Sequence, residues 1–289
     1  MEHFRANDAP NRENAVTKRT VFFVSDQTGI TAETMGHSLM TQFDGIEFRQ
    51  VTVPFISTVD KAIEAVRKID FVAKQEAVRP IVFSTLVQED VRNVVRAGNC
   101  FFLDFFDPFL EPLEHELKTQ SSHAMSRAHR MADTHSYATR IDATNFALAN
   151  DDGSVVRDYE RADVILIGVS RSGKTPTCLY LAMQYGIFAA NYPLTEDDLE
   201  SRKMPRAVEQ HARKLFGLTI RPERLQQIRN ERRPDSRYSS PRQVAFEVRA
   251  AESLFERHGI PLIDTTECSI EEISSRILDR TGIERRLRP

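Results

Sequence analysis

The residues best suited to chemistry form one octet near the middle of the chain: Gly168, Val169, Ser170, Arg171, Ser172, Gly173, Lys174 and Thr175. The glycines let the backbone turn tightly, so that successive N–H groups can point at phosphate oxygens. Lys174 adds a mobile cation for terminal phosphates, and the Thr175 hydroxyl can bind Mg²⁺. The spacing GxxxxGK[ST] therefore predicts a nucleotide site formed by all eight residues, with Lys174 as a catalytic residue and Thr175 as a metal ligand.

The sequence on either side of the octet meets the further requirements of a phosphate loop. Residues 162–167 form an apolar, β-branched run typical of a buried strand, and residues 175–185 carry apolar side chains at helical spacing. Pro176 falls in the first helical turn, where its missing N–H removes no helical hydrogen bond. Such an octet arises by chance in about one chain in a hundred of this length. Because the expected strand and helix also flank it here, we interpret the octet as a functional phosphate loop.

A phosphate-loop enzyme also needs an acidic residue near its Mg²⁺ ion. Asp264 follows the apolar run 260–263, where such an acid would lie, and we expect it to be catalytic. A carboxylate that caps the end of a strand would occupy the same place, so both interpretations stay open. Asp163 lies at the other end of the loop strand and is predicted to be structural. Arg171, inside the loop, suits either a phosphate contact or a solvent-exposed position.

Arginines are concentrated in residues 221–242, where the only acidic residues are Glu223, Glu231 and Asp235. Guanidinium groups suit phosphate oxygens, so this segment could form a lid that neutralises charge during transfer. A solvated helix face would have the same composition, and the sequence does not decide between the two. The arginines are Arg221, Arg224, Arg229, Arg232, Arg233, Arg237 and Arg242.

A second polar turn, residues 25–29, joins a predicted strand to a predicted helix near the N-terminus. The carboxyl ends of parallel strands often bind ligands, so Asp26 could act as a base or metal ligand. Thr28 and Gly29 could line a phosphate site or a protein-binding surface. We favour the simpler interpretation that Asp26 or Thr28 caps the following helix.

These candidate sites require an alternation of strands and helices, and the sequence provides it twice. Strands alternating with helices indicate parallel sheets covered on both faces. We therefore predict an α/β fold of two halves with mostly parallel sheets, the C-terminal half being a P-loop kinase-like domain. The first half has predicted strands at 20–24, 48–55, 80–86 and 100–106, with helices at 31–40, 59–77 and 89–97. The second has strands at 162–167, 187–190 and 260–263, with helices at 175–185, 222–232 and 270–278.

The same pattern divides the chain into a disordered arm (1–19), an N-terminal α/β domain (20–117), a connecting segment (118–154) and a nucleotide-binding domain (155–289). We expect a short helix at 143–149 within the connection. Three histidines lie there, but no carboxylate-supported ligand spacing accompanies them, so we interpret them as linker residues. They are His123, His129 and His135.

Composition restricts the functional classes further. Lys and Arg total 39 against 42 Asp and Glu, a net charge of -3, which gives no overall attraction to nucleic acid or to anionic membranes. The three cysteines lie far apart and suggest neither disulfides nor a zinc site. The N-terminus lacks a signal-peptide core, and no apolar run is long enough for a bilayer. We expect a cytoplasmic protein without nucleic-acid or membrane partners.

Beyond these local patterns, the chain resembles the bacterial pyruvate, phosphate dikinase and phosphoenolpyruvate synthase regulatory proteins, most closely the phosphoenolpyruvate synthase branch. The resemblance runs from about residue 20 nearly to the end of the chain, and its long central segments are highly specific. Its segments are VFFVSDQTGITAE (21–33), ANDDG (149–153), ILIGVSRSGKTPTCLYLAMQYG (165–186), AANYPL (189–194), KLFGLTIRPERLQQIRNERR (214–233) and SRYSS (236–240).

The resemblance implies a bifunctional regulator. Proteins of this family are serine/threonine kinases that use ADP as donor and inactivate the synthase by phosphorylating a threonine near its catalytic histidine. They reverse this with inorganic phosphate and release pyrophosphate. The family's nucleotide site maps onto 168–175, with Mg²⁺ inferred from the loop chemistry. Three alternatives stay open: pyruvate, phosphate dikinase as the target, a small-molecule kinase, and a nucleotide-gated binding protein. The oligomeric state is also open, a homodimer included.

Overall fold

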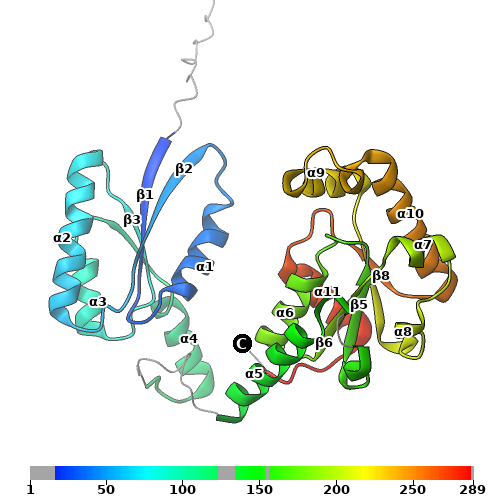
Figure 1. The fold of residues 1–289 in the computed structure, drawn as a ribbon. Helices are drawn as coiled ribbons and strands as arrows, with labels where there is room; N and C mark the ends of the chain where they lie inside the picture. The colour runs from blue at the N-terminus through cyan, green and yellow to red at the C-terminus, as the bar shows by residue number, and fades with distance from the viewer. Residues whose placement is uncertain (1–16, 123–133, 154–155, 288–289) are drawn as a thin grey trace, which may run out of the picture. The chain divides into compact units, whose positions relative to one another are not determined.

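The structure, a computed structural model, describes residues 17–122, 134–153 and 156–287 (Figure 1). The chain divides into two compact units, residues 1–130 and 131–289, and each contains one four-stranded sheet whose strands are all parallel. This arrangement confirms the predicted α/β class with two halves.

The sheet of the first unit has the strand order β2-β1-β3-β4. Its central strand β1 is buried on both faces because its apolar side chains alternate between two cores. Phe22 and Val24 face one core, and Val21 and Phe23 face the other. The strands are β1 (Thr17–Val24), β2 (Ile46–Val53), β3 (Ile81–Ser84) and β4 (Phe101–Asp104).

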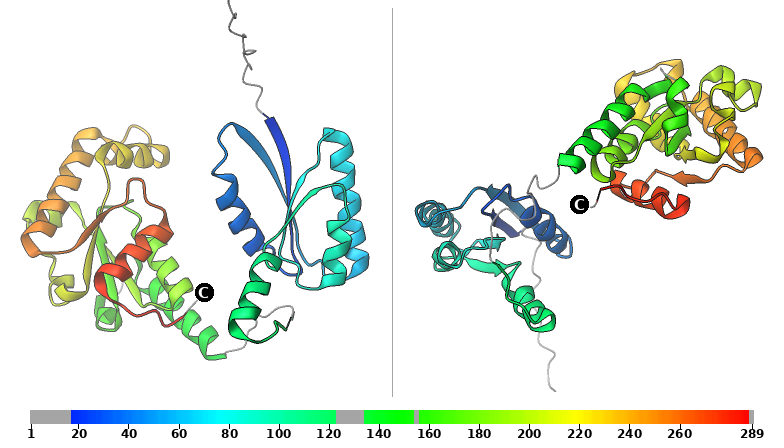
Figure 2. Two further views of the ribbon diagram at one scale, coloured as in Figure 1. Left: turned by 180° about the vertical axis from the view of Figure 1, so that it is seen from behind. Right: turned by 90° about the horizontal axis from the view of Figure 1, so that it is seen from below.

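Helices cover both faces of this sheet (Figures 1 and 2). Helix α1 (Ile30–Met40) packs on the face of Phe23, while α2 (Val59–Glu76) and α3 (Glu89–Arg96) pack on the face of Phe22. A fourth helix, α4 (Asp107–Leu117), follows β4. It begins with Asp107 and Pro108 in its first turn and was not predicted from the sequence.

The sheet of the second unit has the order β6-β5-β7-β8. The chain leaves β5 toward β6 on one side and leaves β7 toward β8 on the other, so the carboxyl ends of β5 and β7 form a topological switch point, where ligands tend to bind. The strands are β5 (Val164–Gly168), β6 (Ala189–Pro193), β7 (Leu215–Thr219) and β8 (Leu262–Asp264).

Helices again cover both faces of this sheet. One face packs against α5 (Thr134–Ala149), α6 (Lys174–Tyr185) and α11 (Ile270–Thr281). The opposite core draws on α7 (Glu196–Ser201), α8 (Arg206–Glu209), α9 (Pro222–Arg232) and α10 (Pro241–His258). Short 3-10 helices span Asp151–Gly153, Val156–Arg161, Ala212–Lys214 and Arg237–Ser239.

Several elements differ from the sequence predictions. Strand β1 begins at Thr17, so residues 17–19 of the predicted arm are strand, and residues 1–16 lie outside the described residues. The short helix expected at 143–149 is the end of the longer α5, which packs against α6 through Ala143 and Ala147. Strand β7 and helix α10 were not predicted at all.

The described residues can be searched for membrane-spanning helices and for metal-binding clusters. Among them, no helix is both long and apolar enough to cross a membrane. They also contain no cluster of three His, Cys, Asp or Glu side chains that could hold a metal ion. His123 and His129 fall outside the described residues.

Candidate nucleotide site

The octet 168–175 forms the turn between β5 and α6, and its two glycines are needed for different reasons. A Cβ on Gly168 would lie 2.4 Å from the Leu218 carbonyl oxygen, so only glycine allows β7 to approach this closely. Gly173 has open space around its Cα but a φ of 92°, a conformation that L side chains rarely adopt. Gly173 is also the N-cap of α6 and no side chain caps that helix, so its first N–H groups are left for a ligand.

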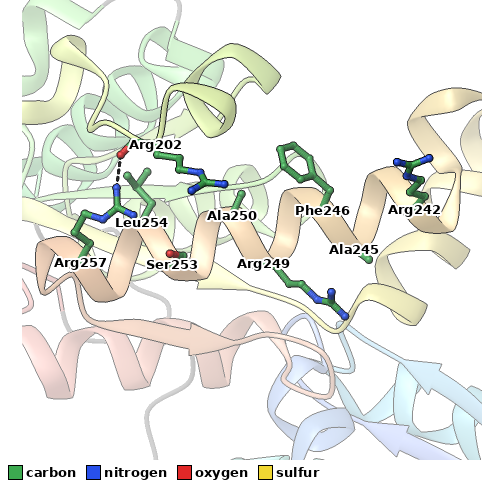
Figure 3. A pocket seen from close by; sticks show the side chains of 9 residues that line it. All are labelled: Arg202, Arg242, Ala245, Phe246, Arg249, Ala250, Ser253, Leu254 and Arg257. Atoms are coloured by element: carbon green, nitrogen blue, oxygen red, sulfur yellow. Dashed lines mark hydrogen bonds between the residues drawn. The ribbon is translucent and has the colours of Figure 1, made fainter.

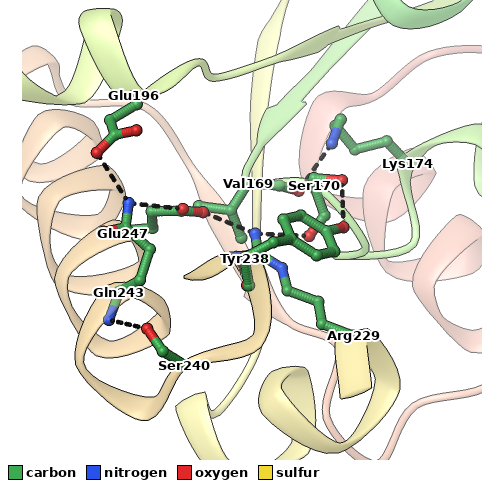
Figure 4. A network of polar contacts seen from close by, with 9 residues as sticks. All are labelled: Val169, Ser170, Lys174, Glu196, Arg229, Tyr238, Ser240, Gln243 and Glu247. Atoms are coloured by element: carbon green, nitrogen blue, oxygen red, sulfur yellow. Dashed lines mark hydrogen bonds and ion pairs between the residues drawn. The ribbon is translucent and has the colours of Figure 1, made fainter. Parts of the chain in front are cut away.

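Lys174 lies at the start of α6 and is 5% exposed. Its Nζ donates a hydrogen bond to the Val169 carbonyl oxygen, 2.8 Å away (Figure 4). Burial lowers the pKa of Lys174 from 10.5 to about 8, while the nearby Asp152 and Asp151 carboxylates oppose this change. The ammonium group is thus held inside the loop by one neutral acceptor, which an incoming phosphate could replace.

A pocket of about 300 Å³ opens over this loop. Arg171, with φ at 74°, is exposed at its edge, which leaves its guanidinium free to reach a ligand or solvent. The pocket brings together five residues of the predicted octet with two others, and its lining consists of Asp152, Ser170, Arg171, Gly173, Lys174, Thr175 and Pro176.

An acidic group not predicted from the sequence lies beside Thr175. The Thr175 hydroxyl donates to the Asp151 carboxylate over 2.8 Å, and the Asn191 amide of β6 also donates to that carboxylate. Hydroxyl and carboxylate oxygens are the ligands that Mg²⁺ prefers, so Thr175 and Asp151 fit such an ion. The neighbouring Asp152 is exposed, lines the pocket and has a φ of 53°.

The second side of the loop is held by a buried polar network (Figure 4). Arg229 of α9 is fully buried and donates to the Ser170 carbonyl oxygen at 3.1 Å and to the Glu247 carboxylate at 2.7 Å. Its guanidinium lies 4.3 Å from the ring centroid of Tyr238, whose hydroxyl is 2.9 Å from the Ser170 hydroxyl. This network ties α9, α10 and the 236–240 loop to the phosphate loop.

The arginine-rich segment therefore has several separate roles. Arg229 supports the loop from within the core. Arg221 pairs with Glu267 and Arg237 with Glu196 on the surface. Arg224 donates to Gln227 at 2.8 Å, and the exposed Arg232, Arg233 and Arg242 form no ion pair within the described residues. Helix α9 forms half of the segment, and none of the segment's arginines lines the 300 Å³ pocket.

Asp264 ends β8, as predicted, but it does not line the pocket over the loop. Its carboxylate is exposed and accepts hydrogen bonds from the backbone N–H, at 2.9 Å, and the hydroxyl of Thr266. This is the geometry of a carboxylate that caps a strand end. The adjacent Thr265 instead reaches the loop, since its hydroxyl donates to the Ser172 carbonyl oxygen at 3.2 Å.

Asp163 has the structural role that the sequence predicted. It accepts a hydrogen bond from the Phe188 N–H at 2.8 Å and pairs with Arg286. Its partners lie on the connection into β6 and in the C-terminal segment, away from the pocket lining.

The turn 25–29 of the first unit corrects one prediction. The N-cap of α1 is Gly29, in a left-handed conformation, and no side chain caps the helix. Asp26 and Thr28 are therefore not capping residues. Asp26 is 7% exposed, one of its carboxylate oxygens has no hydrogen-bond partner among the described residues, and burial raises its pKa.

Sequence reasoning missed Asp151, Asp152 and Asn191 as site residues because they are distant from Thr175 along the chain. Asp151 and Asp152 entered the sequence analysis only as part of the ANDDG segment, without a site role. The signal that could have found them was their place in the ANDDG segment, which is acidic and lies just before the loop strand.

Comparison with known proteins shows the family of this chain. The model of the family described as kinase/pyrophosphorylase matches residues 21–278. A relative from Alcanivorax borkumensis is 54% identical over 93% of this chain and 99% of its own. A relative from Stutzerimonas stutzeri is 54% identical over 94% of this chain and 100% of its own. A relative from Alkalilimnicola ehrlichii is 54% identical over 93% of this chain and 98% of its own. All three bear the provisional name phosphoenolpyruvate synthase regulatory protein. The chain belongs to the kinase/pyrophosphorylase family.

Proposed function

We propose that this protein is a bifunctional serine/threonine kinase and phosphorylase that regulates phosphoenolpyruvate synthase in the bacterial cytoplasm. It would inactivate the synthase by ADP-dependent threonine phosphorylation and reactivate it with inorganic phosphate. The observation that carries the proposal is the buried Lys174 inside an uncapped helix N-terminus, which suits a chain of phosphates. The relatives' name supports the choice of partner, and the family description supports both directions of reaction.

In the forward direction, a threonine hydroxyl of the synthase attacks the β-phosphorus of ADP. The bond from that phosphorus to the oxygen bridging the α- and β-phosphates breaks, and AMP leaves with the bridging oxygen. Lys174 and the first N–H groups of α6 stabilise the negative charge on the phosphate oxygens. Asp152, exposed at the pocket, is placed to accept the threonine proton.

In the reverse direction, an oxygen of inorganic phosphate attacks the phosphorus of the phosphothreonine. The phosphorus–threonine oxygen bond breaks, pyrophosphate forms, and the threonine oxygen leaves and takes back a proton. Pyrophosphate then occupies the loop as the two phosphates of ADP do, so Lys174 serves both directions. Thr175 and Asp151 would hold Mg²⁺, which neutralises phosphate charge when bound.

The proposal is tested by the intact mass of purified phosphoenolpyruvate synthase after incubation with this protein, Mg²⁺ and either ADP or ATP. We expect one added phosphoryl group with ADP only, its removal by inorganic phosphate, and pyrophosphate as the product. An unchanged mass with both nucleotides would contradict the assigned partner, and pyruvate, phosphate dikinase would be tested next. If both proteins stay unmodified while a metabolite is phosphorylated, the chain is a small-molecule kinase.

A further inference from the structure

A groove of about 530 Å³ runs along the outer side of α10 and is lined by arginines without any carboxylate (Figure 3). Arg242, Arg249 and Arg257 come from α10 itself, and Arg202 comes from the end of α7. The first and last of the three on α10 are 15 positions apart, which is about 22 Å along the helix axis. The groove is separate from the nucleotide pocket, with which it shares no lining residue.

Most of these arginines lack partners within the described part of the chain. Arg202, Arg242 and Arg249 form no side-chain ion pair or hydrogen bond there, and Arg257 donates only to the Arg202 carbonyl oxygen, at 2.7 Å. By contrast, Arg229 and Arg237 nearby each pair with a glutamate. The lining contains four arginines and no carboxylate, which makes the groove positively charged and electrostatically suited to an acidic ligand.

The groove is also partly apolar and is built on a rigid element. The Phe246 ring is 40% exposed, and Phe246 and Leu254 both lie in the lining of the groove. The opposite side of α10 is anchored in the core by Val248 and other buried residues. An acidic segment with some apolar side chains would match both properties, whereas a nucleic-acid backbone would match only the charge.

The position of the groove connects it to the nucleotide site. Helix α10 follows directly after the 236–240 loop, and Tyr238 of that loop contacts Ser170 of the phosphate loop. Arg242 therefore lies only a few residues from groups that touch the loop. We propose that this groove docks an acidic, partly apolar segment of the protein substrate and so brings its threonine to the pocket. This inference rests on the proposed function for the identity of the substrate.

The kinetic test compares the wild type with Arg242→Glu/Arg249→Glu, using the full chain, ADP and purified phosphoenolpyruvate synthase. We expect the KM for the synthase to rise at least about tenfold, because attraction becomes repulsion, while kcat and the Kd of ADP stay within about twofold. The control Arg140→Glu/Arg213→Glu reverses two exposed arginines, on α5 and beside β7, whose side chains have no partner in the part of the chain that the structure describes. It should leave KM unchanged. Equal effects in both variants, or no effect in either, would overturn the proposal.

A binding test separates failure of the groove from failure of the proposed function. The probes are a fluorescein-labelled, 18-residue amphipathic peptide of Glu and Leu and a labelled single-stranded DNA of 18 nucleotides. We expect fluorescence anisotropy to show peptide binding that weakens at least about tenfold in Arg242→Glu/Arg249→Glu but not in the control. Peptide binding that is unchanged in Arg242→Glu/Arg249→Glu would overturn the assigned partner. So would DNA that binds the wild type more tightly than the peptide does and no longer binds this variant.

Discussion

At the scale of single residues, Lys174 faces two opposing demands. It must be charged to bind phosphate, yet its burial favours the neutral amine and lowers its pKa to about 8. Below pH 8 the lysine is protonated in both folded and unfolded chains, so the full cost of burying the charge is present there. Between pH 8 and 10.5 the unfolded chain binds more protons, and the folded state gains stability as the pH rises.

Lys174→Met should therefore stabilise the protein while it removes activity. Removing the buried charge should raise the free energy of unfolding at pH 7 by about 1–3 kcal/mol. This gain should fall by more than half near pH 9.5, where the wild type is largely neutral at this position. Urea denaturation at both pH values measures the effect, with the exposed Lys203→Met as control. A lower free energy of unfolding for the variant at pH 7 would show that burying the charged lysine does not cost stability.

Asp152 and Asp264 give a second residue-scale prediction, since only Asp152 lines the pocket. Asp152→Asn should lower kcat about 100-fold or more if it accepts the threonine proton. Asp264→Asn should keep kcat within about twofold, because this carboxylate is occupied by Thr266. Both rates would be measured on phosphoenolpyruvate synthase. The reverse pattern would make Asp264 the catalytic carboxylate near Mg²⁺ that its sequence position suggested.

At this scale, the sequence was most informative where the requirement is local. Gly168, Gly173, Lys174 and Thr175 are specified by their own spacing, and the structure gathers three of them at one pocket. Asp151 could not be assigned in the same way, because its contact with Thr175 depends on the pairing of β5 with β6. Such contacts are set by tertiary packing and leave little trace in a local pattern.

At the scale of elements, Arg229 links α9 to the phosphate loop and to α10. Its side chain has no exposed surface and that of its partner Glu247 is 13% exposed. A buried ion pair adds little net stability, but removing one partner leaves the other charge unpaired. The role of this pair is therefore to fix the position of Ser170 and Tyr238 around the loop.

Arg229→Met should lower the free energy of unfolding by about 3–5 kcal/mol, because it leaves the Glu247 carboxylate without its partner. Arg224→Met, on the exposed side of the same helix, should change it by no more than about 0.5 kcal/mol. The double variant Arg229→Met/Glu247→Leu should recover much of the loss. Chemical denaturation provides all three values, and a loss that persists unchanged in the double variant would refute the ion-pair explanation.

The elements that the sequence missed have identifiable physical causes. Gly217 interrupts the apolar run of β7, which hid the strand, and the structure requires it because a Cβ would lie 2.9 Å from the Phe255 ring. Helix α10 does carry apolar residues at helical spacing, among them Val244, Val248 and Phe255, so its pattern could have been found. The strand and helix next to the octet were easier to predict, because a phosphate loop requires a strand before it and a helix after it.

At the scale of the whole molecule, each unit has cores of its own. All described contacts of the phosphate loop come from residues of the 131–289 unit. Residues 131–289 expressed alone should therefore fold and bind ADP with a Kd within about threefold of the full chain, a threefold change being less than 1 kcal/mol. Isothermal titration measures this, with Lys174→Ala in the same fragment as control. A folded fragment that does not bind ADP would place part of the nucleotide site in the first unit.

The central claim is that one phosphate loop performs both directions of transfer, and the most direct measurement is the intact mass of phosphoenolpyruvate synthase treated with Lys174→Ala. Unmodified synthase would be incubated with ADP, and synthase phosphorylated by the wild type would be incubated with inorganic phosphate. We predict that the variant neither adds nor removes the phosphoryl group, while its circular dichroism spectrum stays that of the wild type. A variant that cannot add the group but removes it at the wild-type rate would contradict a shared site.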